Sequence, residues 1–226
     1  MESQYQRSKS LGLLYDLGFV KDYFVVWQFQ KLLLEKRIAG EIPDSLVLVE
    51  HDHVLTLGRS SHFDNILVEE LPKFEIERGG DVTYHGPGQL VAYPIISLQE
   101  RSLGVRQYVE LLEALISNAL CHFGLKSNGK LGQLTGVWID DKRKIASIGV
   151  AVSHWVTYHG FALNVNTDLT YFQKIKPCGF ESGIMTSARK ELGREYVEMD
   201  EVKKLIVESS SQMLNLDFEL MESNLQ

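Results

Sequence analysis

Three stretches of the chain repeat apolar residues at the three- and four-residue spacing of a helix with one buried face. The stretch 22–39 begins at Asp22, a residue type that caps helix N-termini, and stops before Gly40, a residue type that often follows a helix C-terminus. The stretches 105–122 and 200–214 show the same periodicity. The pattern therefore predicts three amphipathic helices.

Short runs rich in β-branched residues predict the strands. The runs 46–50 and 54–58 flank the polar tripeptide 51–53, which predicts a strand, a turn and a strand. Further strands are predicted at 74–77, 90–97, 136–140, 145–153 and 155–165. Because the strands outnumber the helices and tend to follow one another, the sequence predicts a single α+β domain over residues 1–226, with mixed β-sheets and packed helices.

The composition is that of a globular protein with a full core. The 226 residues are 44% hydrophobic and 23% charged, which excludes the disordered and collagen-like classes. The net charge of -7 disfavours a nucleic-acid partner. The N-terminus is polar, and the chain has no apolar run of the ~18 residues that a membrane span needs. We therefore expect a cytoplasmic protein with no membrane partner.

Two cysteines, Cys121 and Cys178, are too few for a disulfide framework or a structural zinc site and fit a reducing compartment. Cys121 falls on the apolar face of the helix predicted at 105–122, where we expect it to pack in the core. Cys178 follows Lys174 and Lys176, whose charges favour a thiolate nucleophile. The alternative for Cys178 is a buried cysteine that packs as a small hydrophobic residue.

Lys144 stands where a charged turn runs into an apolar strand. A lysine that loses hydration at such a boundary can serve as a general base, and the alternative is an ordinary exposed turn lysine. His51 and His53 have no third ligand at a suitable spacing, so their pattern does not indicate a metal site.

The segment 78–89 holds four glycines, one proline, an arginine and a histidine between two predicted strands. Such a segment can approach a ligand closely, and the alternative is a glycine-rich hairpin kept for its turn geometry. The spacings of phosphate-binding and dinucleotide-binding loops are absent from the chain, so nucleotide binding has no motif support. Gly160 interrupts a predicted strand, which indicates close approach of a ligand or of another backbone.

Five segments together resemble the lipoyl(octanoyl) transferases. They are Thr56-Leu-Gly-Arg59, the glycine-rich segment 78–89, Gly136-Val-Trp138 followed by Lys144-Ile-Ala-Ser-Ile-Gly149, His159-Gly-Phe-Ala-Leu-Asn-Val-Asn166, and Pro177-Cys-Gly179. The resemblance covers nearly the whole chain. It implies a fold shared with the lipoate-protein ligases and with the catalytic domain of biotin-protein ligases.

This resemblance also implies residue roles. Cys178 matches the nucleophile that forms an acyl thioester, and Lys144 matches the residue that lowers the thiol pKa and moves protons. The acyl-binding positions of the family match Arg78, Gly79, Gly80, Asp81, Val82, Thr83, Tyr84, His85, Ser147, Ile148, Gly149, Gly160, Phe161 and Ala162. Asp81 and Phe161 depart from the usual family residues, and we expect Phe161 to affect how the acyl chain is seated.

The backbone N–H groups around 178–179 and near Gly79 or Gly80 are candidate donors to the tetrahedral oxyanion, and His85 is a candidate orienting group. The implied reaction transfers octanoyl from octanoyl-acyl carrier protein to a lysine of a lipoyl domain, which is the first step of protein lipoylation. The acceptors are the lipoyl domains of 2-oxoacid dehydrogenase complexes and the glycine cleavage H protein, and lipoyl-acyl carrier protein is a second candidate donor. Exchange of one thioester for another requires no ATP, and no metal or other cofactor is expected.

Three other functions remain open on the sequence alone. An ATP-dependent lipoate or biotin ligase would share the fold without a cysteine nucleophile. A papain-like hydrolase would pair Cys178 with His85 or His159 and release the acyl group to water. A non-catalytic module would only bind the carrier protein or the lipoyl domain.

Overall fold

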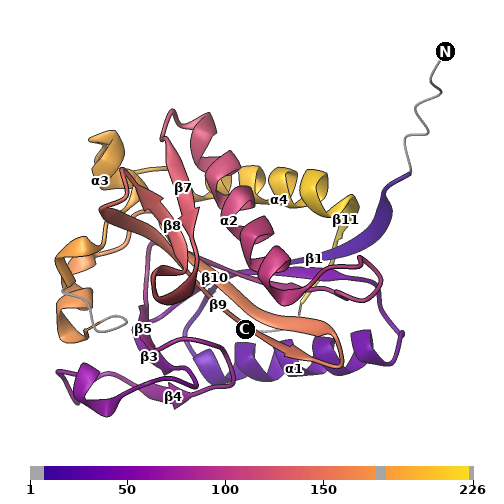
Figure 1. The fold of residues 1–226 in the computed structure, drawn as a ribbon, viewed down its shortest axis with the longest axis horizontal. Helices are drawn as coiled ribbons and strands as arrows, with labels where there is room; N and C mark the ends of the chain where they lie inside the picture. The colour runs from indigo at the N-terminus through magenta and orange to yellow at the C-terminus, as the bar shows by residue number, and fades with distance from the viewer. Residues whose placement is uncertain (1–7, 177–181, 224–226) are drawn as a thin grey trace.

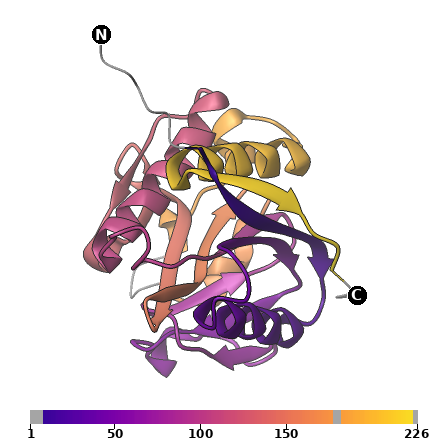
Figure 2. The same cartoon turned by 90° about the vertical axis from the view of Figure 1, so that its right-hand side faces the viewer.

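The computed structural model describes residues 8–176 and 182–223. Its centre is a mixed eight-stranded sheet with helices on both faces, which confirms the α+β prediction (Figures 1 and 2). β1 runs parallel to β2 and β11, and the other neighbouring strands are antiparallel. Across the sheet, the strands follow in the order β11 (Leu216–Leu220), β1 (Ser10–Val20), β2 (Ser45–His51), β6 (Gln89–Ile95), β10 (Val156–Asn164), β9 (Arg143–Ser153), β8 (Gly136–Ile139) and β7 (Ser127–Lys130).

A second sheet has three strands. In it, β3 (Val54–Leu57) pairs in parallel with β4 (Lys73–Glu75) and antiparallel with β5 (Val82–His85). The strands predicted on either side of the tripeptide 51–53 are both present, but β2 and β3 join different sheets. They separate because their apolar residues pack into different clusters: Leu46 and Leu48 of β2 face the main core, whereas Leu55 of β3 packs in the small sheet's own core.

Four strands have no counterpart in the sequence-based prediction. Gly12, Asp16 and Gly18 interrupt the apolar pattern of β1, and β5 lies inside the glycine-rich segment 78–89. β7 is largely polar and lacks the alternation that marks a half-buried strand. β11 does alternate apolar and polar residues, over five residues directly after α4, and the sequence-based prediction missed it.

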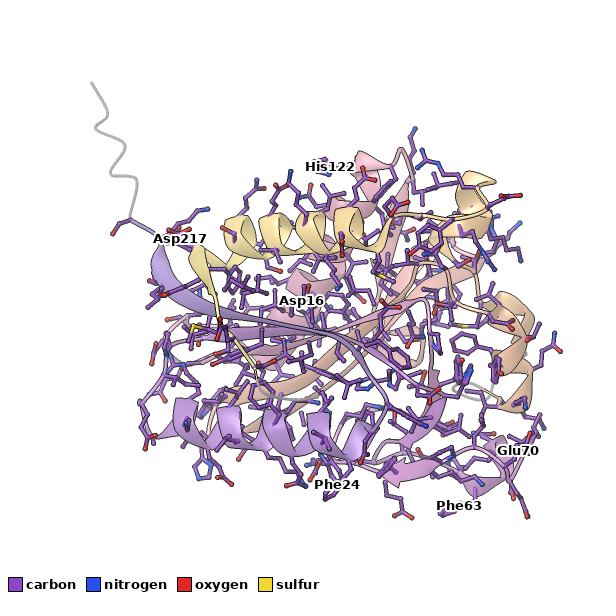
Figure 3. All side chains as sticks on the ribbon, turned by 180° about the vertical axis from the view of Figure 1, so that it is seen from behind. Asp16, Phe24, Phe63, Glu70, His122 and Asp217 are labelled. Atoms are coloured by element: carbon purple, nitrogen blue, oxygen red, sulfur yellow. The ribbon has the colours of Figure 1, made fainter. Side chains whose placement is uncertain are left out.

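The three predicted helices are confirmed as α1 (Tyr23–Ile38), α2 (Val105–His122) and α4 (Met199–Leu214). The Asp22 side chain accepts a hydrogen bond from the backbone N–H of Phe24 and so caps α1. α1 packs on β6 and β10, whereas α2 and α4 pack on each other on the opposite face of the sheet (Figures 1 and 2). Phe24 lies on the outer, exposed side of α1 (Figure 3).

The chain also forms a short helix, α3 (Ala188–Leu192), and several single turns of 3-10 helix. No helix in the described part of the chain is both long and apolar enough to cross a membrane.

Cys121 is exposed, which corrects the expectation that it packs in the core. It lies one residue beyond Leu120, which corresponds to about 100° of rotation around the helix axis, so its side chain turns away from the sheet. The buried face of α2 consists of Tyr108, Leu112, Glu113, Leu115, Ile116, Ala119 and Leu120.

Candidate active site

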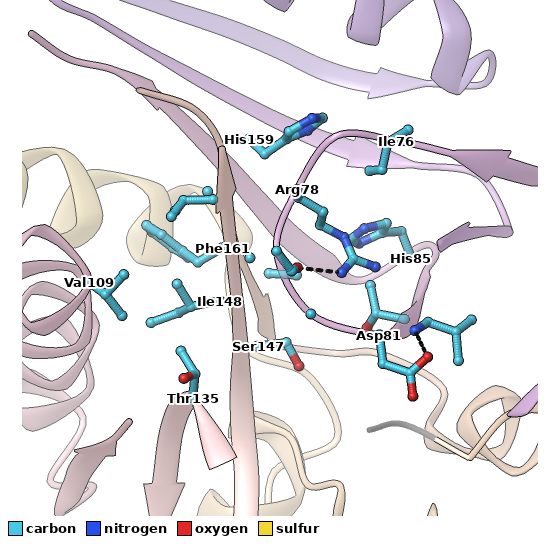
Figure 4. Close-up of a pocket in the computed structure, with 18 of the residues that line it drawn as sticks. Ile76, Arg78, Asp81, His85, Val109, Thr135, Ser147, Ile148, His159 and Phe161 are labelled. Carbon is cyan, nitrogen blue, oxygen red and sulfur yellow. Dashed lines mark hydrogen bonds between the residues drawn. The ribbon is translucent and has the colours of Figure 1, made fainter. Parts of the chain in front are cut away.

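A cavity of about 840 Å³ lies where the glycine-rich segment meets strands β9 and β10. Val109, Ile148 and Phe161 lie on one side of these strands, and Arg78 and His85 lie on the other (Figure 4). The cavity therefore combines an apolar wall beneath α2 with a polar wall beside the small sheet.

Most of the acyl-binding residues predicted from the sequence line this one cavity. Tyr84 does not line it, because its side chain is fully buried in the core of the small sheet. There its hydroxyl lies 2.7 Å from His53 Nδ1, and its ring stacks on Tyr171. The predicted residues that line the cavity are Arg78, Gly79, Gly80, Asp81, Val82, Thr83, His85, Ser147, Ile148, Gly149, Gly160, Phe161 and Ala162, together with Lys144.

Close backbone contacts account for the glycines of the site. A Cβ at Gly149 would lie 2.9 Å from Cδ of Arg78, and a Cβ at Gly160 would lie 2.7 Å from Cδ of Pro94. Gly160 is therefore required by the approach of the neighbouring strand β6. The hairpin alternative for the segment 78–89 is wrong, because β5 and β6 belong to different sheets.

The glycine-rich segment is attached to β9 of the large sheet. The backbone N–H of Gly79 donates to the carbonyl of Val150 in β9, at 2.9 Å. Because this N–H already has an acceptor, Gly80 is the better candidate of the two for an oxyanion donor.

Arg78 and Asp81 fix the first part of the segment. The Arg78 guanidinium donates to the carbonyl oxygen of Thr56 at 2.6 Å and to its hydroxyl at 3.0 Å. The Asp81 carboxylate accepts from the backbone N–H of Val82 at 2.6 Å and from the side-chain amide of Asn65 at 2.5 Å. Arg78 thus places a fixed positive charge in the cavity wall, whereas the Asp81 carboxylate accepts the hydrogen bonds that hold the loop.

His85 forms part of a hydrogen-bonded network in the polar wall. Its Nδ1 lies 2.8 Å from Oε1 of Gln89, whose amide nitrogen donates to Asn164 at 2.9 Å. Since the Gln89 nitrogen is used in this way, its oxygen accepts from His85, and Nδ1 carries the proton. Burial lowers the pKa of His85 to about 4, so the imidazole is neutral near pH 7.

Two further histidines are buried close to His85. His51 lies 2.8 Å from the hydroxyl of Tyr93, and burial holds its pKa well below the ordinary value. His159 lies 3.5 Å from the carboxylate of Glu77, and burial lowers its pKa as well. The polar wall therefore includes the neutral imidazoles of His85 and His159 and two tyrosines, with Arg78 as a permanent cation, whereas His51 does not itself line the cavity.

Lys144 lies in the cavity wall with 6% of its surface exposed, so the alternative of an exposed turn lysine is wrong. It stands opposite Trp138 of β8, and its Nζ lies 5.6 Å from the centre of that ring. A Cβ at Gly136 would lie 2.7 Å from its Cε, so the aliphatic chain of Lys144 lies directly on the Gly136 backbone. Its carbonyl accepts from the N–H of Thr186 at 2.9 Å.

Cys178 and Gly179 lie outside the described residues. On the N-terminal side of this segment, the N–H of Lys176 donates to the carbonyl of Asn65 at 2.8 Å. On its C-terminal side, Met185 forms a parallel bridge with Lys144 and lines the cavity. The C-terminal flank is thus anchored beside the cavity, and the N-terminal flank is held by Asn65, whose side chain binds Asp81 of the cavity wall. Lys174 is one of the two lysines expected from the sequence to favour a thiolate, and its ammonium forms an ion pair with the Glu70 carboxylate at 2.8 Å.

The sequence-based prediction misses several cavity residues. Tyr23 and Tyr93 come from α1 and β6, far apart in the chain, and no local pattern brings them together. Val105 and Val109 lie on α2 outside its buried stripe, at a spacing of four residues. That second apolar face on an already amphipathic helix is the one signal that could have indicated them.

No group of three or more His, Cys, Asp or Glu side chains within residues 8–176 and 182–223 is arranged to hold a metal ion.

Comparison with known proteins gives consistent matches over almost the whole chain. Residues 22–211 match the family model of the lipoyl protein ligase A/B catalytic domain. An octanoyltransferase of Bacteroides thetaiotaomicron is 44% identical over 209 residues, which covers 85% of this chain and 91% of that protein. An octanoyltransferase of Flavobacterium johnsoniae is 43% identical over 216 residues, which covers 86% of this chain and 92% of that protein.

Solved structures share the fold at low sequence identity. The bipartite lipoate protein ligase of Thermoplasma acidophilum, solved in a study that included its E2 lipoyl domain, has a TM-score of 0.70 at 17% identity and covers 95% of this chain and 88% of that chain. The biotin protein ligase of Aquifex aeolicus, in complex with biotin and ATP, has a TM-score of 0.55 at 15% identity and covers 89% of this chain and 70% of that chain.

Proposed function

Because the chain belongs to the octanoyltransferases of the lipoyl protein ligase A/B catalytic-domain family, we propose that this acyltransferase moves an octanoyl group from octanoyl-acyl carrier protein to lipoyl-domain lysines. The acceptors in this proposal are the lipoyl domains of 2-oxoacid dehydrogenase complexes and the glycine cleavage H protein. The acyl group passes through a thioester on Cys178, and lipoyl-acyl carrier protein is a second donor. We place the reaction in the cytoplasm as the first step of protein lipoylation.

The observation that carries the proposal is the position of Lys144. This lysine lies 6% exposed in the wall of the cavity, where the three segments matched to acyl-binding positions converge. An amine so enclosed can exchange a proton with a reacting group inside the cavity, which an exposed turn lysine could not do with the same geometry. The apolar wall of Val109, Ile148 and Phe161 suits the hydrocarbon part of an acyl donor.

The proposed reaction has two balanced steps. In the first, the Lys144 amine takes the Cys178 proton, the thiolate attacks the donor carbonyl, and the carrier thiolate leaves with the proton from Lys144. In the second, the acceptor lysine amine attacks the enzyme thioester and loses a proton to Lys144, an amide forms, and the Cys178 thiolate leaves and takes that proton back from Lys144. Division of one transfer into two such steps is covalent catalysis. Because the acyl group arrives already activated as a thioester, the proposal needs no ATP, metal or other cofactor.

Neutral histidines and the fixed Arg78 set the electrostatics for these steps. A tetrahedral oxyanion forms in each step and is stabilised by N–H donors already in place. Gly80 and the backbone at 178–179 are the donors we propose, since the N–H of Gly79 is bound to Val150. His85 is held by Gln89 and is proposed as an orienting group rather than as a base.

The proposal is tested by incubating the protein with octanoyl-acyl carrier protein, with and without ATP, and measuring its intact mass. We expect one added octanoyl group without ATP, and none on the Cys178→Ser variant. A lipoyl domain added afterwards should gain the group on its lysine. A requirement for ATP would favour the ligase alternative, and release of free octanoate without labelled lipoyl domain would favour the hydrolase.

Lys144→Ala tests the lysine separately, with Lys142→Ala as its matched control, because Lys142 lies two residues away and is exposed. We expect at least a ten-fold slower transfer for Lys144→Ala and an unchanged rate for Lys142→Ala. Equal rates for the two variants would overturn the role proposed for Lys144.

A further inference from the structure

Glu113 is a buried carboxylate on the sheet-facing side of α2, with 6% of its surface exposed. Its Oε1 accepts a hydrogen bond from the backbone N–H of Gly136 at 3.3 Å. A carboxylate kept out of water requires compensating donors or an opposite charge nearby. One backbone donor at this distance does not by itself meet that requirement, so other groups around Glu113 must contribute.

The side chain of Glu113 is enclosed by the hairpin of β7 and β8. Gly129 of β7 is a glycine because a Cβ there would lie 2.6 Å from Cδ of Glu113. Gly136 of β8 has φ +140°, a conformation that L side chains rarely adopt, and it pairs with Lys130 of β7. The carboxylate thus lies against the base of this hairpin, at the point where its loop begins.

The hairpin loop borders the cavity. Gly132 and Thr135 line it, and the Thr135 hydroxyl donates to the carbonyl of Gly132 at 2.6 Å. The indole N–H of Trp138 donates to the carbonyl of Leu134 at 2.8 Å, which ties the loop to β8. Glu113 therefore anchors a loop whose shape forms part of the cavity wall.

Gly136 links Glu113 to Lys144 directly. Its N–H binds the Glu113 carboxylate, and its α-carbon supports Cε of Lys144. The Lys144 ammonium and the Glu113 carboxylate also attract each other through space. Burial raises the pKa of Glu113, Glu110 raises it further, and the Lys144 ammonium and the N–H groups of Gly136 and Lys130 lower it.

We propose that Glu113 is a positioning residue for Lys144: it fixes the Gly136 backbone on which the lysine lies, and its negative charge favours the ammonium form. The catalytic meaning of this arrangement rests on the function proposed above, whereas the arrangement itself does not. The groups that face the Glu113 carboxylate are Glu110 on α2, Lys130 on β7, the Gly136 backbone on β8 and Lys144 on β9.

The test measures Lys144 itself, separately from acyl transfer. The full-length protein is treated briefly with acetic anhydride at a series of pH values, and the acetylation of Lys144 is quantified by peptide mass spectrometry relative to Lys142. Only the neutral amine reacts, so the pH of half-maximal labelling reports its protonation. Glu113→Gln retains the shape and an oxygen acceptor for Gly136 but removes the charge. Glu110→Gln removes a charge from an exposed position one turn earlier on the same helix and is the matched control.

We expect Glu113→Gln to move half-maximal labelling of Lys144 to lower pH by about one unit, because loss of a nearby opposite charge disfavours the ammonium. Glu110→Gln should leave the midpoint where it is. A second route uses Gly129→Ala, whose Cβ would displace the carboxylate, and the same direction of shift is expected there. Labelling curves of Glu113→Gln and Gly129→Ala that superimpose on the wild-type curve would overturn the proposal.

Acyl-transfer rates measured on the same proteins distinguish the positioning role of Glu113 from the catalytic role of Lys144. If the labelling midpoint shifts and Lys144→Ala abolishes transfer, both the positioning role and its catalytic meaning are supported. If the midpoint shifts but Lys144→Ala transfers normally, the role of Lys144 in the proposed function fails while Glu113 still positions it. If Lys144→Ala is inactive and the midpoint stays fixed, only the inference about Glu113 fails.

Discussion

Gly149 and Arg78 are in such close contact that a methyl group on Gly149 would lie 2.9 Å from Cδ of Arg78. Gly149 belongs to β9 of the large sheet, and Arg78 begins the glycine-rich segment whose β5 belongs to the small sheet. The same Arg78 is held from the other side by the carbonyl of Thr56 in β3. The position of this guanidinium in the cavity therefore depends on the absence of a side chain at residue 149.

Gly149→Ala should displace Arg78 and lower acyl transfer by a factor of ten or more, since carbon atoms separated by 2.9 Å must move apart. The fall should appear mainly in kcat/KM, because the wall that meets the acyl donor changes shape. Gly183→Ala is the matched control, since a Cβ at Gly183 meets nothing within 4 Å. Steady-state transfer of both variants, with thermal unfolding as a check of folding, is the measurement. Full activity of Gly149→Ala would show that Arg78 need not keep its position.

His85 should make the protein less stable in mild acid. Burial lowers its pKa from 6.5 to about 4, so the folded state binds its proton less readily than the unfolded chain does. His85 therefore leaves the free energy of unfolding unchanged above pH 6.5 and lowers it as the pH falls from 6.5 toward 4. One pKa unit corresponds to about 1.4 kcal/mol, so His85 can account for roughly 3 kcal/mol over this interval.

Chemical denaturation at pH 7, 5.5 and 4.5 measures this effect. The decline of unfolding free energy should be smaller in His85→Gln than in the wild-type protein, because the variant has no imidazole to protonate at that position. The variant should still lose some unfolding free energy at low pH, since burial lowers the pKa values of His51 and His159 too. His122→Gln changes an exposed histidine at the end of α2 and should retain the wild-type slope. Equal slopes for His85→Gln and wild type would contradict the prediction.

The sequence predicts the local features well, because caps and periodicity are local. α1 begins after Asp22, whose side chain caps it, and the glycines of 78–89 do mark a cavity. The sequence cannot predict the tyrosines of the polar wall. Tyr23 and Tyr93 meet only because α1 packs on β6, and no spacing within the chain encodes that contact.

Two other errors have specific physical reasons. Tyr84 lies within the matched motif, but its side chain packs in the core of the small sheet, and a motif carries no information on where a side chain packs until the sheets are known. Glu113 belongs to the buried face of α2, yet a carboxylate within an apolar stripe has no meaning until β7 and β8 are seen to supply its partners.

Cys121 should react with thiol reagents in the native protein, since it is exposed on α2. Cys121→Ser should change the free energy of unfolding by less than about 0.5 kcal/mol, as expected for a surface substitution. Titration with a chromogenic disulfide reagent, compared between the wild type and this variant, measures the reactivity. A large loss of stability in Cys121→Ser would instead restore the packing role expected from the sequence. The variant also leaves Cys178 as the single thiol for the acylation experiment.

Asp81 should contribute to stability and to cavity shape through one carboxylate with several bonds. It accepts from Val82 N at 2.6 Å, from the Asn65 side chain at 2.5 Å and from the backbone N–H of His62 at 3.2 Å. Hydrogen bonds to a charged group contribute about 1.5–3 kcal/mol each, although shared acceptors are not additive. Asp81→Ala should therefore lower the free energy of unfolding by about 2–4 kcal/mol.

Asp81→Asn separates the charge of this residue from its shape. Its remaining oxygen can still accept from Val82 N, whereas its amide nitrogen would face the donor nitrogen of Asn65. We expect an intermediate stability and a transfer rate between those of Asp81→Ala and the wild type, because the variant keeps one of the two shortest hydrogen bonds of Asp81. Denaturant unfolding and transfer assays on the wild type and the two variants measure the order of their stabilities and transfer rates. If both variants kept wild-type stability but lost transfer, Asp81 would act on the acyl donor itself rather than on the loop.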